Sequence, residues 1–246
     1  MSEDLKGKIA LITGANKGIG FEIARQLGFR GATVLVGARD IARGEEAANK
    51  LRSNQIDART IQLDVIDQKT IDSAGKQIES EFGKLDILVN NAGIVSDGDR
   101  FPPSQVDIET LRHTYETNVF GVFAVTKALL PLLKKSKAGR IVNLSSGLGS
   151  LTQNSDPNSE FADFRYLAYN SSKTALNAIT VVLAGELKDT PIKVNAADPG
   201  FTATDINQHR GYRTVEQGAI AAVRLATLPD DGSSGGFFNE NGVVPW

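Results

Sequence analysis

Tyr169 and Lys173 stand four residues apart in a segment, Tyr-Asn-Ser-Ser-Lys, that is typical of a helix. Side chains at this spacing lie on one face, one turn apart. A lysine ammonium beside a phenol favours the phenolate, and a phenol with a lowered pKa is a useful proton donor near neutral pH. The pair alone is weak evidence, because the same spacing occurs by chance on many helices. Other motifs in the chain are needed to show whether the pair is catalytic.

Apolar, β-branched runs alternate with amphipathic stretches along the whole chain. We expect strands at 8–13, 33–37, 60–63, 85–89, 140–145 and 192–197. We expect helices at 19–29, 41–53, 68–82, 106–118, 119–135, 165–188 and 214–227. Near-continuous apolar strands indicate burial on both faces, hence a parallel sheet covered by helices. The alternation predicts one α/β domain over residues 1–246 with a doubly wound parallel sheet, the Rossmann fold.

Composition excludes several classes of function. The formal net charge is −2, there is no cysteine, and the only histidines are His113 and His209. A nucleic-acid partner would call for a basic excess, so none is expected. Disulfides, zinc–thiolate sites and thiol catalysis are excluded, and we expect no metal site. The N-terminal residues contain neither a signal peptide nor a membrane span, so we expect a cytoplasmic protein without a membrane partner.

The first expected strand leads into a glycine-rich turn, Thr13-Gly14-Ala-Asn16-Lys17-Gly18-Ile19-Gly20, and then into a helix. The three glycines permit a tight turn, a close approach to a pyrophosphate and close packing of helix on strand. The helix N-terminus then faces the negative charge. A glycine triplet at the first β-to-α turn of a doubly wound sheet predicts dinucleotide binding.

The residues after the second strand indicate which dinucleotide binds. A carboxylate there would bind the ribose 2′-hydroxyl of NAD, and a basic residue would accept the 2′-phosphate of NADP. The strand is expected to end near Ala38, so Arg39 is the first side chain beyond it, and Asp40 suits the N-cap of the next helix. Lys17 adds a second cation, so we predict NADP(H). The alternative is that Lys17 and Arg39 are solvated surface charges.

The chain resembles the short-chain dehydrogenase/reductase family through motifs in order across nearly its whole length. The glycine turn is followed by Asn90-Asn91-Ala92-Gly93, Asn118 in Thr-Asn-Val-Phe-Gly, Ser145-Ser146, Tyr169-x-x-x-Lys173, and Pro199-Gly200 with Thr204. Within the family, the glycine turn and Ala38-Arg39-Asp40 look most like the NADPH-dependent carbonyl reductases. The resemblance implies hydride transfer to an aldehyde or ketone, giving an alcohol.

Reduction of a carbonyl needs a positioned proton donor and a polar group at the developing alkoxide. The resemblance implies that Tyr169 is the general acid, and that Lys173 lowers its pKa and holds the nicotinamide ribose. It also implies that Ser146 binds the substrate oxygen, and that Asn118 holds a water linking Lys173 to solvent.

Each of these roles has a competitor. Ser145 competes with Ser146, although the family usually uses the second serine of the pair. Tyr166 competes with Tyr169, but Asn170 rather than lysine follows it four residues later. Asn118 has an alternative role as a helix-bend asparagine.

The resemblance also implies contacts with the cofactor: adenine after the third strand, adenosine at Asn90, and nicotinamide in the loop after the sixth strand. The expected cofactor-binding residues are Gly14, Asn16, Lys17, Gly18, Ile19, Gly20, Arg39, Asp64, Val65, Asn90, Tyr169, Lys173, Pro199, Thr202 and Thr204.

Two segment lengths depart from the commonest family pattern. The irregular stretch near 147–165 is longer than in most members, and we expect its Phe161, Phe164 and Asp156 beside the active-site mouth. The stretch from Thr204 to the helix at 214 is short, which predicts an open pocket for bulky or varied carbonyl compounds. The alternative is loop-length drift without consequence.

The sequence leaves open the oligomeric state of the protein and the direction of the reaction. The helices at 119–135 and 165–188 favour a homo-oligomer by resemblance to the family. An alternative function is an NAD(P)-linked alcohol dehydrogenase acting in the oxidative direction. A remote alternative is a non-catalytic dinucleotide-sensing protein on the same fold. Such proteins typically lose the tyrosine or lysine, and this chain has both.

Overall fold

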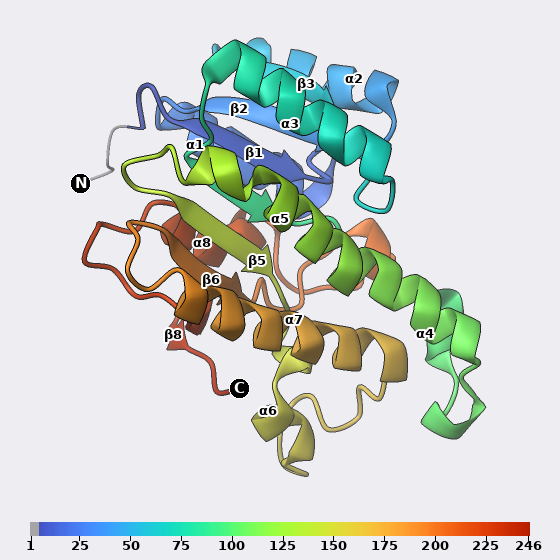
Figure 1. Ribbon diagram of the computed structural model, residues 1–246. Helices are drawn as coiled ribbons and strands as arrows, with labels where there is room; N and C mark the ends of the chain where they lie inside the picture. Colours follow the sequence, from blue (N-terminus) through green and yellow to red (C-terminus); the bar gives the residue numbers. More distant parts are fainter. Residues whose placement is uncertain (1–4) are drawn as a thin grey trace.

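An eight-stranded sheet with the order β3-β2-β1-β4-β5-β6-β7-β8 forms the centre of the computed structural model, which describes residues 5–246 (Figure 1). All neighbouring strands are parallel except β7 and β8. The strands are β1 (Ile9–Thr13), β2 (Thr33–Ala38), β3 (Ala58–Gln62), β4 (Ile87–Asn90), β5 (Arg140–Leu144), β6 (Lys193–Ala197), β7 (Phe237–Asn239) and β8 (Gly242–Val243). The predicted doubly wound α/β fold is confirmed.

Helices cover both faces of the sheet, as the continuous apolar strands predicted. They are α1 (Gly18–Phe29), α2 (Ile41–Arg52), α3 (Gln68–Phe82), α4 (Ile108–Tyr115), α5 (Val122–Leu133), α6 (Leu151–Ser155), α7 (Leu167–Glu186) and α8 (Val215–Ala226). Alternate side chains of β1 enter opposite cores: Ile12 packs with α1, α2 and α8, and Leu11 with α3, α5 and α7. In Figure 1, α3, α5 and α7 lie on the near side of the sheet.

The structure departs from the sequence prediction in three places. The short strands β7 and β8 were not predicted, and α6 interrupts the stretch expected to be irregular. The predicted boundary between helices at residue 118 is wrong, because a π-helical segment, η3 (Glu116–Gly121), joins α4 to α5. The carbonyl and amide of Ile94 bind the Asn118 side chain within η3, so a tertiary contact accompanies the wider turn.

The helical run from Ile108 to Leu133 is the one in the described part of the chain that is long and apolar enough to cross a membrane. Half of its most apolar window is buried inside the protein. Its α5 part packs on β4 and α3, as a core helix does.

The sheet gathers four loops at one edge. Strand order reverses between β1 and β4, which lie side by side with β2 on one flank and β5 on the other. In open parallel sheets, ligands bind outside the carboxyl ends of the strands at this switch point. The glycine turn, the Asn90–Gly93 motif, the Ser145-Ser146 pair and the Pro199-Gly200 loop all follow strands at this edge.

Candidate active site

Helix α7 brings Tyr169 and Lys173 onto one face, as the spacing predicted. The Lys173 Nζ lies 5.6 Å from the centre of the Tyr169 ring. The ammonium is buried and donates a hydrogen bond of 2.8 Å to the carbonyl of Leu144, the last residue of β5. The pair therefore points at the end of β5, where the two serines stand.

The two serines have different surroundings. Ser145 is buried and donates a hydrogen bond of 2.6 Å to Asn177 Oδ1. Ser146 is half-buried, its Oγ accepts a hydrogen bond of 3.2 Å from the amide of Leu148, and its side chain is close enough to the Tyr169 phenol to lower the pKa of the phenol. This geometry favours Ser146 over Ser145 as the group that meets a substrate oxygen.

Asn118 lies in the π-helical segment and is completely buried. Its amide makes two hydrogen bonds of 2.9 Å to the backbone of Ile94, one as acceptor and one as donor. A Cβ at Gly93 would lie 3.3 Å from Asn118 Oδ1 and 3.5 Å from Lys173 Nζ, so both side chains converge on this glycine. The hydrogen bonds of its amide to Ile94 fit the role of a helix-bend asparagine. Its position beside Lys173 fits the role of holding a water that links Lys173 to solvent.

The pKa values of the pair are shifted by burial. Burial raises the pKa of Tyr169 to about 12, with a smaller upward contribution from the Asp198 carboxylate and an opposing one from the Ser146 side chain. Burial lowers the pKa of Lys173 to about 8. The net shift of the Tyr169 pKa is therefore upward, because removal of the phenol from water outweighs the opposing contribution. That Lys173 lowers this pKa stays a prediction.

The glycine turn has the geometry that an anion site needs. Gly14 and Gly18 have φ values of +64° and +58°, which favour glycine. A Cβ at Gly20 would lie 2.4 Å from Asn91 Nδ2, so this position is sterically closed to a side chain. The N-cap residue of α1, Lys17, makes no side-chain hydrogen bond to the first turn. The turn residues, Asn16 and Ile19 among them, thus surround a helix N-terminus suited to a pyrophosphate.

Asn91 is a site residue that the sequence analysis left out of the cofactor set. Its Nδ2 donates to the carbonyls of Thr13 and Gly14 at 2.8 and 3.2 Å, and Thr13 Oγ1 accepts from the amides of Asn91 and Ala92. These bonds fix the glycine turn to the loop after β4. The position of Asn91 in the Asn90–Gly93 motif was the feature of the sequence that could have indicated this role.

The predicted 2′-phosphate site holds two exposed cations. Asp40 caps α2 by accepting from the amides of Ala42 and Arg43, as expected. Within residues 5–246, the exposed Arg39 guanidinium makes no hydrogen bond or ion pair, so it can bind a phosphate. Lys17 is ion-paired with Asp205, from the loop after β6.

The predicted adenosine contacts differ in exposure. Asp64 is half-buried after β3, and Val65 beside it is buried. Asn90 is buried with its Nδ2 directed at Thr126 and Asn143, at 2.9 and 2.8 Å. Its Oδ1 is buried and has no hydrogen-bond partner among the described residues. This side chain therefore belongs mainly to the interior of the sheet.

The loop after β6 lies close to the glycine turn. The Thr204 methyl group is 3.7 Å from a Cβ placed at Gly18. Thr202 is buried, and its hydroxyl donates to the carbonyl of Pro199 at 2.9 Å. Thr204 thus lies beside the glycine turn, whereas the Thr202 hydroxyl is engaged within its own loop.

Aromatic rings lie beside the Ser146 segment and the loop after β6. The Phe161 ring would lie 2.7 Å from a Cβ at Gly147, the residue after Ser146. The rings of Phe164, Phe201 and Tyr212 follow one another at centre distances of 6.2 and 6.0 Å. Phe161 therefore lies beside the Ser146 segment, and Phe164 lies beside the loop after β6. Asp156 is exposed, and its carboxylate accepts from the amide of Asn158 in its own turn.

Comparisons with known proteins show the family. A family model described as "short chain dehydrogenase" matches residues 8–213. The chain belongs to the short-chain dehydrogenase/reductase family. Salutaridine reductase from Papaver bracteatum is 38% identical to it, with 95% of this chain and 94% of that protein covered. A (+)-neomenthol dehydrogenase from Arabidopsis thaliana is 37% identical, with 96% and 97% covered. The solved NADPH-bound carbonyl reductase from chicken fatty liver is 26% identical, with a TM-score of 0.85 and 98% and 99% covered.

This member of the short-chain dehydrogenase/reductase family has a shorter chain than salutaridine reductase. Its alignment with salutaridine reductase spans 296 positions, more than the 246 residues of this chain, so that relative carries insertions absent here.

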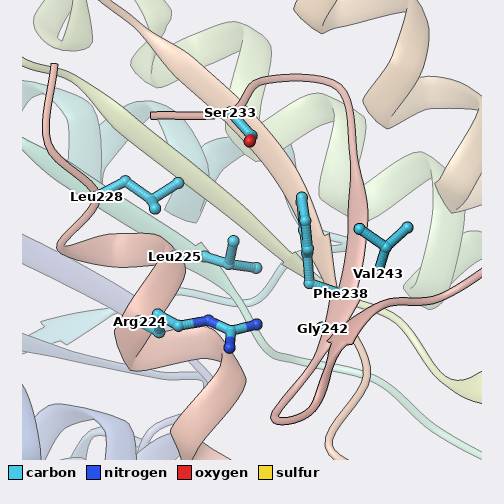
Figure 2. A pocket seen from close by; sticks show the side chains of 7 residues that line it. All are labelled: Arg224, Leu225, Leu228, Ser233, Phe238, Gly242 and Val243. Atoms are coloured by element: carbon cyan, nitrogen blue, oxygen red, sulfur yellow. The ribbon is translucent and has the colours of Figure 1, made fainter. Parts of the chain in front are cut away.

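A separate cavity of about 240 Å³ lies between α8 and the β7–β8 hairpin (Figure 2). Its lining residues are Arg224, Leu225, Leu228, Ser233, Phe238, Gly242 and Val243. The cavity contains none of the residues predicted for catalysis or cofactor binding.

Proposed function

We propose that this family member reduces aldehydes or ketones to alcohols with NADPH. The observation that carries the proposal is the convergence of Ser146, Tyr169 and Lys173 at the end of β5, with Asn118 beside them. Two of the relatives described above are named as reductases, and one of these was solved with NADPH bound.

The chain offers a fitting site for the cofactor, which supplies the hydride when it is bound. Gly14, Gly18 and Gly20 would receive the pyrophosphate at the N-terminus of α1. Arg39 and Lys17 would hold the 2′-phosphate. The other residues that would line this site are Asn16, Ile19, Asp64, Val65, Asn90, Pro199, Thr202 and Thr204.

The proton for the alcohol would come from Tyr169. With a pKa of about 12, its phenol holds its proton throughout the neutral range. Ser146 would donate a hydrogen bond to the carbonyl oxygen, and the phenol would release its proton as negative charge develops there. Lys173, with a pKa of about 8, is mainly protonated at pH 7. It would return a proton to Tyr169, and a water held by Asn118 would link Lys173 to solvent.

The aromatic rings beside the Ser146 segment and the loop after β6 support an apolar, bulky carbonyl substrate. Phe164, Phe201 and Tyr212 are exposed by 37%, 37% and 74%, although such rings are normally buried.

Turnover with a panel of aldehydes, ketones and diketones tests the proposal through the loss of NADPH absorbance. Reduction of several of them supports it. Oxidation of alcohols with NADP⁺ and no reduction with NADPH would favour the dehydrogenase. Tight NADPH binding without turnover in either direction would favour a dinucleotide sensor.

Assembly and location are further parts of the proposal. Phe123 on α5 and Val182 on α7 are exposed by 45% and 71%, which supports a homo-oligomer through these helices. A molecular mass from light scattering tests this. A cytoplasmic location stays a prediction.

A further inference from the structure

Asp99 is a fully buried carboxylate with no part in the roles proposed above. It lies in the 3-10 turn η1 (Asp97–Arg100) of the loop after β4, and its exposure is 0%. Its two oxygens accept hydrogen bonds from the backbone amides of Ala168, at 2.8 Å, and Tyr169, at 2.7 Å. A buried carboxylate therefore holds the backbone of the residue whose phenol is the proposed acid.

Helix α7 receives its N-terminal cap from this distant carboxylate. The residue at its own N-cap position, Tyr166, makes no side-chain hydrogen bond to the first turn. Buried first-turn amides need an acceptor, and they carry the positive end of the helix dipole. Asp99 supplies both an acceptor and a negative charge from 69 and 70 residues earlier in the chain.

The same loop also holds Asn118. Ile94, at the start of the loop, binds the Asn118 amide through both its N–H and its carbonyl. Asn118 Nδ2 donates to Ser172 Oγ at 3.1 Å, and Ser172 Oγ donates to the carbonyl of Tyr169 at 2.7 Å. These hydrogen bonds therefore connect the Tyr169 carbonyl, through Ser172, Asn118 and the loop, to the Tyr169 amide.

We propose that Asp99 is a positioning residue for Tyr169, which fixes the start of α7 so that the phenol stays within hydrogen-bonding reach of Ser146. This inference rests on the proposed function, in which Tyr169 is the proton donor. A displacement of about 1 Å in a reacting group can lower a rate by about 100-fold. The carboxylate acts on the backbone, so its loss should change kcat and leave cofactor affinity intact.

The surroundings of Asp99 allow a substitution to be tolerated. A cavity of about 340 Å³ borders it, between the loop at 99–103 and residues 163–166. Water in such a polar cavity can satisfy amides that lose their acceptor. The fold is then expected to survive while the start of α7 becomes less strictly placed.

Asp99→Asn tests the proposal, because the asparagine has the same shape but only one acceptor oxygen for two amides. The matched control is Asp97→Asn, in the same turn, whose side chain is 96% exposed. The measurements are kcat at saturating NADPH and carbonyl, the NADPH Kd from fluorescence titration, and the urea unfolding midpoint. We expect kcat of D99N to fall by about tenfold or more with a Kd within about twofold of wild type, and D97N to be unchanged.

Two results would overturn the proposal. One is a folded D99N with wild-type kcat. The other is a loss of kcat and of NADPH affinity together, in proportion to the unfolded fraction, since that indicates a role in folding alone. If D99N does not fold, Asp99→Glu keeps the charge and displaces the carboxylate by one methylene. Lower kcat with unchanged Kd supports the proposal, and wild-type kcat overturns it.

The wild type and Tyr169→Phe separate this inference from the proposed function. A wild type without turnover, or a fully active Y169F, contradicts the proposed function itself. An active wild type, an inactive Y169F and an unaffected D99N contradict only the role of Asp99.

Discussion

The Lys173 ammonium donates its hydrogen bond to the end of β5 and lies 5.6 Å from the centre of the Tyr169 ring. The lysine is therefore held beside the phenol and is not bonded to it. Because burial dominates both pKa values, the protein without cofactor keeps its tyrosine protonated and has a lysine that titrates near pH 8.

Tyr169→Phe should lower kcat by about 10²–10⁴-fold while the NADPH Kd stays close to that of the wild type. Phenylalanine keeps the ring and removes only the hydroxyl group that carries the proton for the substrate. Tyr166→Phe is the control, because Tyr166 is also half-buried at the start of α7. A Y169F enzyme that keeps more than a few per cent of wild-type kcat would refute the general-acid role.

Arg39→Asp should invert the cofactor preference. The change removes a free cation and places a carboxylate where the 2′-phosphate is expected, so the ratio of kcat/KM for NADPH over NADH should fall by at least about 100-fold. The same charge change at the far end of α2, Lys50→Asp, is the control. An unchanged ratio in R39D would show that Arg39 is a solvated surface charge.

Lys173→Met should stabilise the protein at pH 7 and abolish turnover. Below pH 8 the folded wild type carries the buried charge of Lys173, which water would solvate better. Between pH 8 and 10.5 only the unfolded chain keeps the lysine proton, so the free energy of unfolding of the wild type rises with pH in this range. Allowing for the hydrogen bond lost by Leu144, the gain at pH 7 is about 1–2 kcal/mol. Urea unfolding at pH 7 and pH 10 should show this advantage shrinking. An equal destabilisation at both values would contradict it.

Asp198→Asn should move the pH profile of alcohol oxidation to lower pH. The Asp198 carboxylate contributes to the raised pKa of Tyr169, and it accepts a hydrogen bond of 2.9 Å from the amide of Gly200. Asparagine keeps an acceptor and removes the charge, so the phenolate needed for oxidation should form more readily. The measurement is kcat/KM against pH, with the exposed Asp156→Asn as control. If the limb on which kcat/KM rises with pH does not move, the charge of Asp198 does not reach the phenol.

Gly20→Ala and Gly75→Ala should have opposite effects. The new methyl group at residue 20 would meet Asn91 Nδ2 at 2.4 Å and the Gly14 carbonyl at 2.8 Å, which should cost about 1–3 kcal/mol and weaken NADPH binding. Gly75 lies within α3 with its nearest neighbour at 3.7 Å, so alanine there should add about 0.5–1 kcal/mol. Urea unfolding tests both. A stabilised G20A would mean that the turn can open without loss.

The parts of the site that depend on neighbouring residues could be predicted from the sequence. The glycine turn and the Tyr169–Lys173 spacing carry their geometry within a few residues, and the Asp40 cap follows from the end of β2. Asp99 gave no comparable signal, because its role depends on a contact with residues 69 and 70 positions later. The net upward shift of the Tyr169 pKa was also missed, because burial is a property of the whole fold.

The π-helical segment Glu116–Gly121 makes this region sensitive to chain length. A π turn holds one residue more than an α turn, and each α-helical residue rotates the chain by about 100°. Because the π turn absorbs this extra residue, loss of a single codon here would restore a regular helix and keep Val125 and Leu129 on the sheet they now pack on, whereas the same loss at the start of α5 would rotate them away from it. Loss within the π segment would carry Asn118 off Ile94. A deletion of one residue in the π segment should therefore damage the candidate active site and spare the core, whereas a deletion at the start of α5 should damage the core.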